Sequence, residues 1–135
     1  MKKKLKKLKK KSVSKLKKEL DSVFSKYIRH KYSKNGLVAC YTCGVVKPIN
    51  QMQNGHFQSR KHLSTRWSED NCRPQDVGCN VFKYGEQYKF GEKLKKEGVD
   101  VEALIFKSRQ LQKFNKVELQ EMINEYKAKL DEYNK

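Results

Sequence analysis

Four cysteines lie in the middle of the chain, and their spacing suits a bound metal ion. Cys40 and Cys43 flank two residues and are followed by Gly44, which favours a tight turn. Zinc prefers thiolate ligands arranged as a tetrahedron, and a C-x-x-C segment supplies two of them from one turn. Cys79 is the predicted third ligand. The sequence therefore predicts a structural zinc ion that fixes the middle of the chain.

The fourth zinc ligand has two rivals in the sequence. Asp76 stands three residues before Cys79, which repeats the Cys40–Cys43 spacing with a carboxylate in place of a thiolate. Cys72 offers a softer sulfur ligand but lacks that spacing. The knuckle spacing favours Asp76, and ligand softness favours Cys72.

Between the two halves of this site stands His56, in the segment Asn54-Gly55-His56-Phe57. An imidazole titrates near neutrality, so it can take a proton from a water molecule that attacks a phosphodiester. Asn80, directly after Cys79, is predicted to hold a catalytic divalent cation, Mg²⁺ or Mn²⁺, through its amide oxygen. Asn71 is expected to cross-link the loop that follows the His56 strand.

The chain is strongly basic, with 32 Lys and Arg against 15 Asp and Glu and a formal net charge of +17. Polyanions such as DNA are the expected partners, because neutralising phosphates releases condensed counterions. Arg60 is the predicted clamp on the scissile phosphate, and a contact to the DNA backbone without a catalytic role is the alternative. The predicted DNA-binding residues are Lys15, Lys17, Lys18, Arg29, Arg60, Lys61, Arg66 and Arg73.

Hydrophobic residues make up only 36% of the chain, so a small core helped by a metal staple is expected. No apolar run approaches the length of a membrane span, and no secretory signal precedes the cysteines. We therefore expect no membrane partner, no small-molecule substrate, a reducing compartment and a cytoplasmic location, in the bacterial host if a phage encodes the protein.

The elements that must position these residues follow from apolar periodicity. A basic arm is predicted over residues 1–11 and a basic helix over 12–36, begun by Ser12 or Ser14 and ended by Asn35-Gly36. The core, residues 37–97, should hold one strand over 52–58, a second over 66–70 that Pro74 follows, and helices from Asp76 and Glu86. Residues 98–135 should form two more helices, the last capped by Asn115. The expected fold class is α+β.

As an ordered set, the motifs resemble a known family. The segments C-x-x-C, GHFQSR, RWSEDN and RPQDVGCN followed by Gly85 resemble the phage lambda NinG (Rap) recombination family over roughly residues 38–95. The order is also similar to phage endonuclease VII, an HNH-type (ββα-metal) nuclease that resolves junctions and carries structural zinc. Gly55 departs from that pattern, since HNH enzymes often have a metal-binding aspartate there. Glu86 is the residue that could supply the missing carboxylate.

The resemblance implies a metal-dependent DNA endonuclease that acts on branched recombination intermediates such as Holliday junctions. A four-way junction has near two-fold symmetry, so a homodimer is expected. Two alternatives remain open: a non-catalytic zinc-ribbon module that binds nucleic acid, and a basic scaffold whose last helix, over Val117 to Tyr133, recruits a recombination partner.

Overall fold

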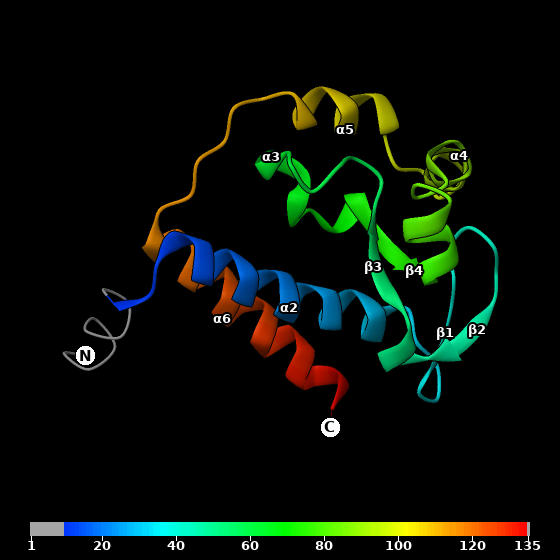
Figure 1. Ribbon diagram of the computed structural model, residues 1–135, viewed down its shortest axis with the longest axis horizontal. Coiled ribbons are helices and arrows are strands. Elements are labelled where there is room, and N and C mark those ends of the chain that lie inside the picture. Colours follow the sequence, from blue (N-terminus) through cyan, green and yellow to red (C-terminus); the bar gives the residue numbers. More distant parts are fainter. Residues whose placement is uncertain (1–9, 135) are drawn as a thin grey trace. The chain divides into compact units, whose positions relative to one another are not determined.

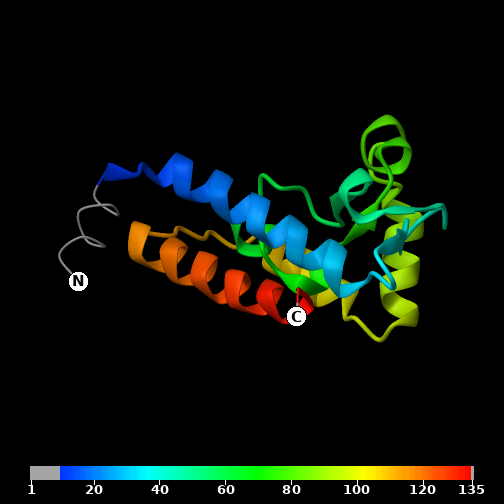
Figure 2. The same ribbon diagram turned by 90° about the horizontal axis from the view of Figure 1, so that it is seen from below.

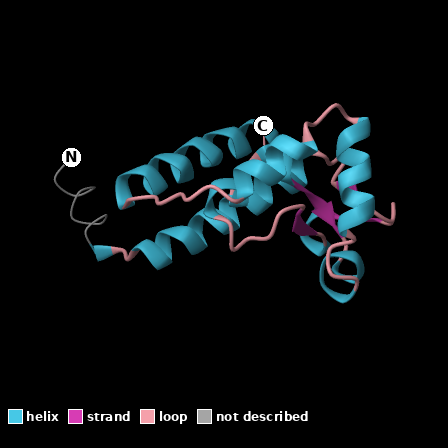
Figure 3. Ribbon diagram, turned by 90° about the horizontal axis from the view of Figure 1, so that it is seen from above, coloured by secondary structure: helices cyan, strands magenta, loops and turns pink. Residues whose placement is uncertain are grey.

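The computed structural model describes residues 10–134, and the predicted basic arm lies largely outside them. The protein is a mixture of helices and short strands, which are coloured separately in Figure 3. The elements are α2 (Val13–Lys31), β1 (Leu37–Ala39), β2 (Val46–Pro48), η1 (Ile49–Gln51), β3 (Gln53–His56), α3 (Leu63–Arg66), η2 (Glu69–Asn71), β4 (Cys72–Gln75), η3 (Gly78–Phe82), α4 (Gln87–Lys96), α5 (Val101–Ser108) and α6 (Lys116–Tyr133). The α+β prediction is therefore confirmed.

The chain forms two compact units. One contains the residues up to Tyr27 together with those from Lys113 onward, and the other contains Ile28–Gln112. The sequence had grouped residues 98–135 as C-terminal helices, whereas the structure places α5 in the central unit. None of the helices within residues 10–134 has the length and apolar character to cross a membrane.

The first unit pairs most of α2 with α6. Ser12 caps α2 by accepting a hydrogen bond from the Lys15 N–H at 3.1 Å, as one of the two predicted caps. Asn115 caps α6 through a capping box with Glu118, which confirms the predicted start of that helix. The apolar stripes that the sequence predicts are buried, with Leu16, Leu20, Phe24, Leu119 and Ile123 fully enclosed.

The two helices run side by side in the same direction, although they come from opposite ends of the chain (Figures 1 and 2). Aromatic rings join them, with Phe24 and Tyr126 centroids 4.8 Å apart in an edge-to-face arrangement. Lys127 of α6 also pairs with Glu19 of α2 at 3.3 Å. Parallel helices cannot be joined by a short turn, and in the sequence most residues of the second unit lie between α2 and α6.

The second unit begins with a β-hairpin that displays the first cysteine pair. Strands β1 and β2 are antiparallel, and the turn between them contains Cys40–Gly44. The Gly44 N–H donates to the Cys40 carbonyl at 2.9 Å, and Gly44 takes a φ of 83° that glycine adopts without strain. The predicted knuckle is therefore the tip of a hairpin.

The second sheet pairs β3 with β4, and its register places His56 opposite Cys72. The predicted second strand over residues 66–70 is wrong, because α3 and η2 occupy that region and β4 starts at Cys72. Pro74 lies inside β4, opposite Asn54, instead of ending a strand. Proline is tolerated there because a two-stranded sheet leaves the outer edge of each strand unpaired. A helical turn of π type, η3, then follows directly.

The second unit has a small apolar core. It is formed by Phe57, directly after β3, and by residues of α4 and α5, namely Phe90, Leu94, Val101 and Leu104. The Phe57 and Phe90 ring centroids are 5.9 Å apart. Burial of side chains of this size stabilises by roughly 1.5–3 kcal/mol each, so this cluster holds the loop after His56 in place.

Candidate functional site

Three of the four cysteines meet at one point. The sulfur atoms of Cys40, Cys43 and Cys79 all lie within 4.8 Å of one another, and Cys43 is exposed while the other two are buried. Tetrahedral zinc with bonds of about 2.3 Å requires sulfur atoms about 3.8 Å apart. A shift of less than about 1 Å would therefore bring the three thiolates to a zinc ion. The group could hold a metal such as zinc, and the residues fit the predicted site.

The surroundings of Cys40 favour a thiolate. Burial opposes ionisation, but backbone N–H groups of Asp76 and Cys43 and the Thr42 hydroxyl outweigh it and lower the pKa of Cys40 to about 6. The Thr42 hydroxyl lies 3.6 Å from the Cys40 sulfur. Burial, with Cys43 and Cys40 nearby, raises the pKa of Cys79. One sulfur is thus prepared to bind as an anion, and a cation would favour ionisation of the others.

Asp76 bonds to the backbone of the turn that follows it and to the first cysteine. Its carboxylate accepts the N–H of Gly78 at 3.1 Å and that of Val77, and its own N–H donates to the Cys40 sulfur. The helical turn η3 starts at Gly78 with Val77 as its N-cap residue, one position after the predicted cap. The carboxylate is paired with the Lys47 ammonium, which lowers the pKa of Asp76. Asp76 therefore occupies the position of a knuckle ligand while binding Lys47.

Cys72 lies outside the three-cysteine cluster. It is fully buried in β4, and its thiol donates to the Arg66 carbonyl at 3.8 Å. The structure thus places neither the Asp76 carboxylate nor the Cys72 sulfur within the cluster. Cys72 instead contacts the carbonyl that orients His56.

The ring of His56 contacts the backbone of α3. Its Nε2 atom lies 2.9 Å from the carbonyl oxygen of Arg66. A carbonyl oxygen can only accept a hydrogen bond, so Nε2 carries a proton, and in the neutral form of the ring the lone pair would lie on Nδ1. The carbonyl of His56 is itself held by the Gln87 side chain at 3.2 Å. These contacts orient both the ring and the strand that carries it, and the role of His56 as a base stays a prediction.

Asn71 makes the predicted cross-link. Its side chain is fully buried, accepts the Gln58 N–H at 2.7 Å, and donates to the Gln58 and Thr65 carbonyls at 3.0 Å each. These bonds close the loop between β3 and β4, which begins directly after His56. Because Arg66 adjoins Thr65, the same clamp fixes the carbonyl that orients the His56 ring.

Replacing Asn71 by alanine is expected to lower the free energy of unfolding by about 3 kcal/mol or more. One buried and two partly buried backbone groups would lose their partner, and each unsatisfied buried group costs about 1–3 kcal/mol. Chemical denaturation measures this change. Asn50→Ala serves as the control, because Asn50 is exposed and such a change usually costs less than about 0.5 kcal/mol. Equal stability of the two variants would contradict the clamp.

Asn80 lies on η3 next to the strand of His56. Its Nδ2 donates to the Gln53 side chain at 2.7 Å, and Gln53 begins β3. With the amide nitrogen engaged in this way, Oδ1 is the atom that could hold a cation. Glu86 is half-buried at the start of α4, where its backbone is left-handed. Its role as a cation ligand stays a prediction.

Gly55 is explained by Gln75 of β4. A Cβ atom at position 55 would lie 2.0 Å from the Gln75 Oε1, so no larger residue fits beside it. Gln75 is fully buried and donates to the Thr42 hydroxyl at 3.1 Å and to the Gly85 carbonyl at 2.9 Å. Gln75 therefore fills the space beside Gly55, where HNH enzymes often have an aspartate. Its side chain also links the β1–β2 hairpin to the segment before α4.

Arg73 was predicted to contact DNA, but the structure places its side chain inside the second unit. Its side chain is 4% exposed, donates to the carbonyls of Glu69 and Cys72, and binds the Glu97 carboxylate at 3.0 Å. Its guanidinium also lies over the rings of Tyr32 and Tyr41. Arg73 therefore stabilises the second unit from within.

The other predicted DNA contacts differ in exposure. Arg29 is half-buried and donates to the Ile49 carbonyl at 2.9 Å, and burial lowers its pKa. Arg66 is half-buried with its guanidinium over the Trp67 ring. The exposed residues are Lys15, Lys18, Arg60 and Lys61, and Lys17 is half-buried. Their contact with DNA stays a prediction.

Sequence reasoning missed Thr42, Gln75 and Gln87 as supporting residues. Thr42 and Gln75 connect the cysteine cluster to β4, and Gln87 binds the His56 carbonyl. Gly55 was the available signal, because an isolated glycine in a strand often marks the close approach of another group.

A protein-family model described as Bacteriophage Lambda NinG protein matches residues 1–135, the full length of the sequence. Searches of curated proteins and of solved structures returned no match. The resemblance drawn from the cysteine, histidine and asparagine motifs is thereby confirmed at the level of the family. The chain belongs to the family of the bacteriophage lambda NinG protein.

Proposed function

We propose that this protein is a metal-dependent DNA endonuclease of the HNH type that acts on branched recombination intermediates. The observation that carries the proposal is the orientation of His56, whose Nε2 donates to the Arg66 carbonyl and whose basic atom is therefore Nδ1. The supporting order of elements is β3, β4 and η3, which follows the strand, strand and helix of a ββα-metal site.

In this mechanism Nδ1 of His56 accepts a proton from the attacking water while the new bond to phosphorus forms and the bond to the leaving oxygen breaks. Arg60 binds the phosphate through its planar guanidinium. Asn80 would hold Mg²⁺ or Mn²⁺ through Oδ1, with Glu86 as a further ligand. Such a cation supplies stabilisation of the charge that develops on the phosphate and the leaving oxygen.

The second metal is a structural zinc held by Cys40, Cys43, Cys79 and Asp76. The Asp76 N–H donates to the Cys40 sulfur, and the Asp76–Cys79 spacing repeats that of Cys40–Cys43, which supports Asp76 as the fourth ligand. Its carboxylate would exchange Lys47 for the metal. This zinc would join the β1–β2 hairpin to η3 and so hold Asn80 beside β3.

The proposed substrate is a four-way junction, bound through exposed basic residues on both units. Phosphate contacts supply affinity for charge and shape and carry no base sequence. Paired cuts across a two-fold junction are the reason to propose a homodimer.

The proposal is tested by incubating the protein with an end-labelled four-way junction and with linear duplex of the same arm sequence. We expect symmetric nicks near the branch point with Mg²⁺ or Mn²⁺, none with chelator, and little cutting of the duplex. Gel analysis of both labelled strands measures this. Binding of the junction without cutting under every cation would instead support the non-catalytic zinc-ribbon alternative.

That alternative is favoured by one observation. Within residues 10–134, three or more possible metal ligands come together only at the cysteine cluster. A cation near His56 would therefore have few protein ligands. Mg²⁺ commonly keeps several waters and few carboxylates, which leaves the nuclease as the stronger proposal.

A further inference from the structure

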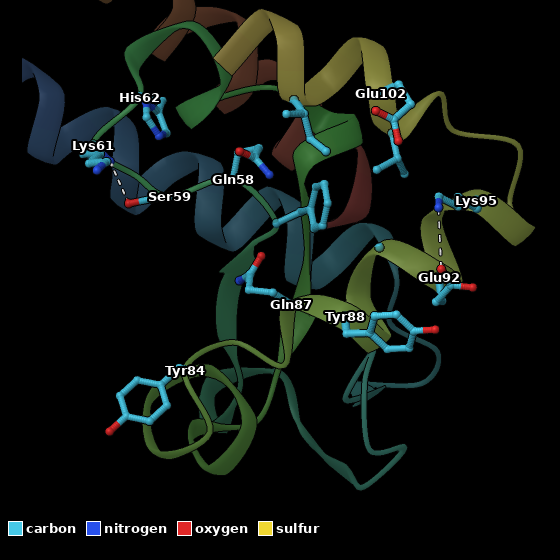
Figure 4. A pocket seen from close by; sticks show the side chains of 14 residues that line it. Gln58, Ser59, Lys61, His62, Tyr84, Gln87, Tyr88, Glu92, Lys95 and Glu102 are labelled. Carbon is cyan, nitrogen blue, oxygen red and sulfur yellow. Dashed lines mark hydrogen bonds and ion pairs between the residues drawn. The ribbon is translucent and has the colours of Figure 1, made fainter. Parts of the chain in front are cut away.

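A pocket of about 740 Å³ opens beside the strand that carries His56 (Figure 4). Phe57 and Gln58, the two residues after His56, line it. Gln87 also lines it and donates to the His56 carbonyl at 3.2 Å. The pocket is therefore tied directly to the proposed catalytic strand, although nothing in the proposed reaction uses it.

Two exposed tyrosines stand at this pocket. Tyr84 is 88% exposed and Tyr88 is 82% exposed, and both contribute to its lining. Figure 4 shows them on either side of Gln87, with their hydroxyl groups directed outward. Aromatic rings so exposed gain little from packing, and two of them at one pocket form a surface on which flat groups can stack.

The backbone that presents Tyr84 is strained. Tyr84, Gly85 and Glu86 have successive φ values of 54°, 85° and 51°, in the left-handed region that tyrosine and glutamate rarely adopt. Gly85 is anchored on both sides, since its N–H donates to the Cys79 carbonyl at 2.8 Å and its carbonyl accepts from Gln75. Such strain persists where surrounding bonds enforce it, and it clusters at functional sites.

The floor and rim of the pocket differ in chemistry. Phe57, Val101 and Ile105 give an apolar floor, and Gly91 leaves it open because a Cβ there would lie 3.0 Å from the Phe57 ring. Lys61 and Lys95 stand at its edge together with Glu92 and Glu102, and Lys95 pairs with Glu92 at 3.6 Å. Between residues 83 and 96 the chain carries five lysines against two glutamates, so the segment that holds the two tyrosines is basic. An apolar floor for a ring and lysines nearby in the chain suit a nucleotide.

We propose that Tyr84 and Tyr88 form a stacking platform for unpaired bases of single-stranded DNA, with the surrounding lysines binding the strand's phosphates. This inference rests on the proposed function, and it names the substrate feature that the site would recognise. Bases exposed at a branch point or in a displaced strand can stack on aromatic side chains, whereas paired bases in a duplex are not available.

The test is fluorescence anisotropy with a labelled oligothymidylate and with a labelled hairpin duplex, without added divalent cation so that no cutting occurs. Tyr84→Asn and Tyr88→Ala are each expected to weaken binding of the single strand about 5- to 30-fold, as loss of one stacked base does. Asparagine is chosen at position 84 because it tolerates a left-handed backbone. Binding of the hairpin duplex should change by less than about 2-fold, because its bases are not free to stack.

Three controls make the result specific. Tyr84→Phe and Tyr88→Phe keep the rings and should bind like the original protein. Phe106→Ala removes an aromatic ring that is 69% exposed on α5 and not part of the pocket lining, and it should leave binding unchanged. Circular dichroism of each variant confirms that the fold is retained.

Unchanged single-strand binding in both tyrosine variants would overturn this inference, and so would an equal loss for single strand and duplex. Neither result bears on His56, since no cutting is measured. Conversely, a protein that cuts no junction but loses single-strand binding in these variants would keep the platform and lose the nuclease.

Discussion

Replacement of His56 by alanine is expected to slow junction cutting by about 10²- to 10⁴-fold, the usual contribution of a positioned general base. The reason is that Nδ1 is the ring atom with a lone pair once Nε2 donates to the Arg66 carbonyl. Single-turnover cutting of a labelled junction with excess protein measures the effect. This design isolates the chemical step from product release.

Two further variants distinguish loss of the basic atom of His56 from loss of its hydrogen bond. His56→Gln can still donate a hydrogen bond to the Arg66 carbonyl but has no basic atom, so it should be as slow as His56→Ala. His30→Ala removes a half-buried histidine of α2 that has no proposed catalytic role, and it should cut at the original rate. Junction binding should be within about 2-fold of the original in all three, because affinity comes mainly from phosphate contacts.

A His56→Gln variant that cuts at the original rate would remove His56 from the role of base and leave only a structural contact. Loss of junction binding in parallel with cutting would point to the alternative binding function. A slow variant with intact binding is the outcome that only the base assignment predicts.

Helix starts were the part of the fold that the sequence determined most closely. Ser12 and Asn115 cap α2 and α6 because their side chains bond to backbone groups only three residues away. The end of the first helix was predicted less closely, since α2 ends at Lys31, before Asn35-Gly36. The strand that carries His56 also followed from local pattern. Such features depend on neighbours in the chain, which a single sequence reveals.

The position of β4 and the role of Arg73 depend on distant residues and could not be read in the same way. Pro74 suggested the end of a strand, yet its carbonyl accepts the Tyr41 N–H at 2.8 Å and the residue stays within the sheet. Arg73 looked like a DNA contact because basic side chains are usually exposed. Its partner Glu97 lies on another element, and no local pattern predicts that pair.

Removal of the proposed zinc is expected to lower the melting temperature of the second unit, residues 28–112, by roughly 15 °C or more. A metal present at about 1,000 times its dissociation constant stabilises by about 4 kcal/mol, and 1 kcal/mol corresponds to about 4–8 °C in a unit of this size. The physical cause is that zinc would join the β1–β2 hairpin to η3, segments far apart in the chain. Calorimetry before and after chelation, with metal analysis, measures both quantities. An unchanged melting temperature would contradict a structural zinc.

The same assay distinguishes the two rivals for the fourth ligand. Asp76→Ala is expected to weaken zinc binding by at least about 10- to 100-fold. Mutation of a residue that only hydrogen-bonds to a metal ligand already lowers metal affinity by that factor. Asp76→Cys should bind zinc at least as tightly as the original, because it places a thiolate at the same spacing from Cys79 that separates Cys40 and Cys43. Cys72→Ala should retain its zinc, because Cys72 contacts the Arg66 carbonyl and lies outside the cluster. Zinc lost from Cys72→Ala but kept by Asp76→Ala would reverse the assignment and require β4 to move toward the hairpin.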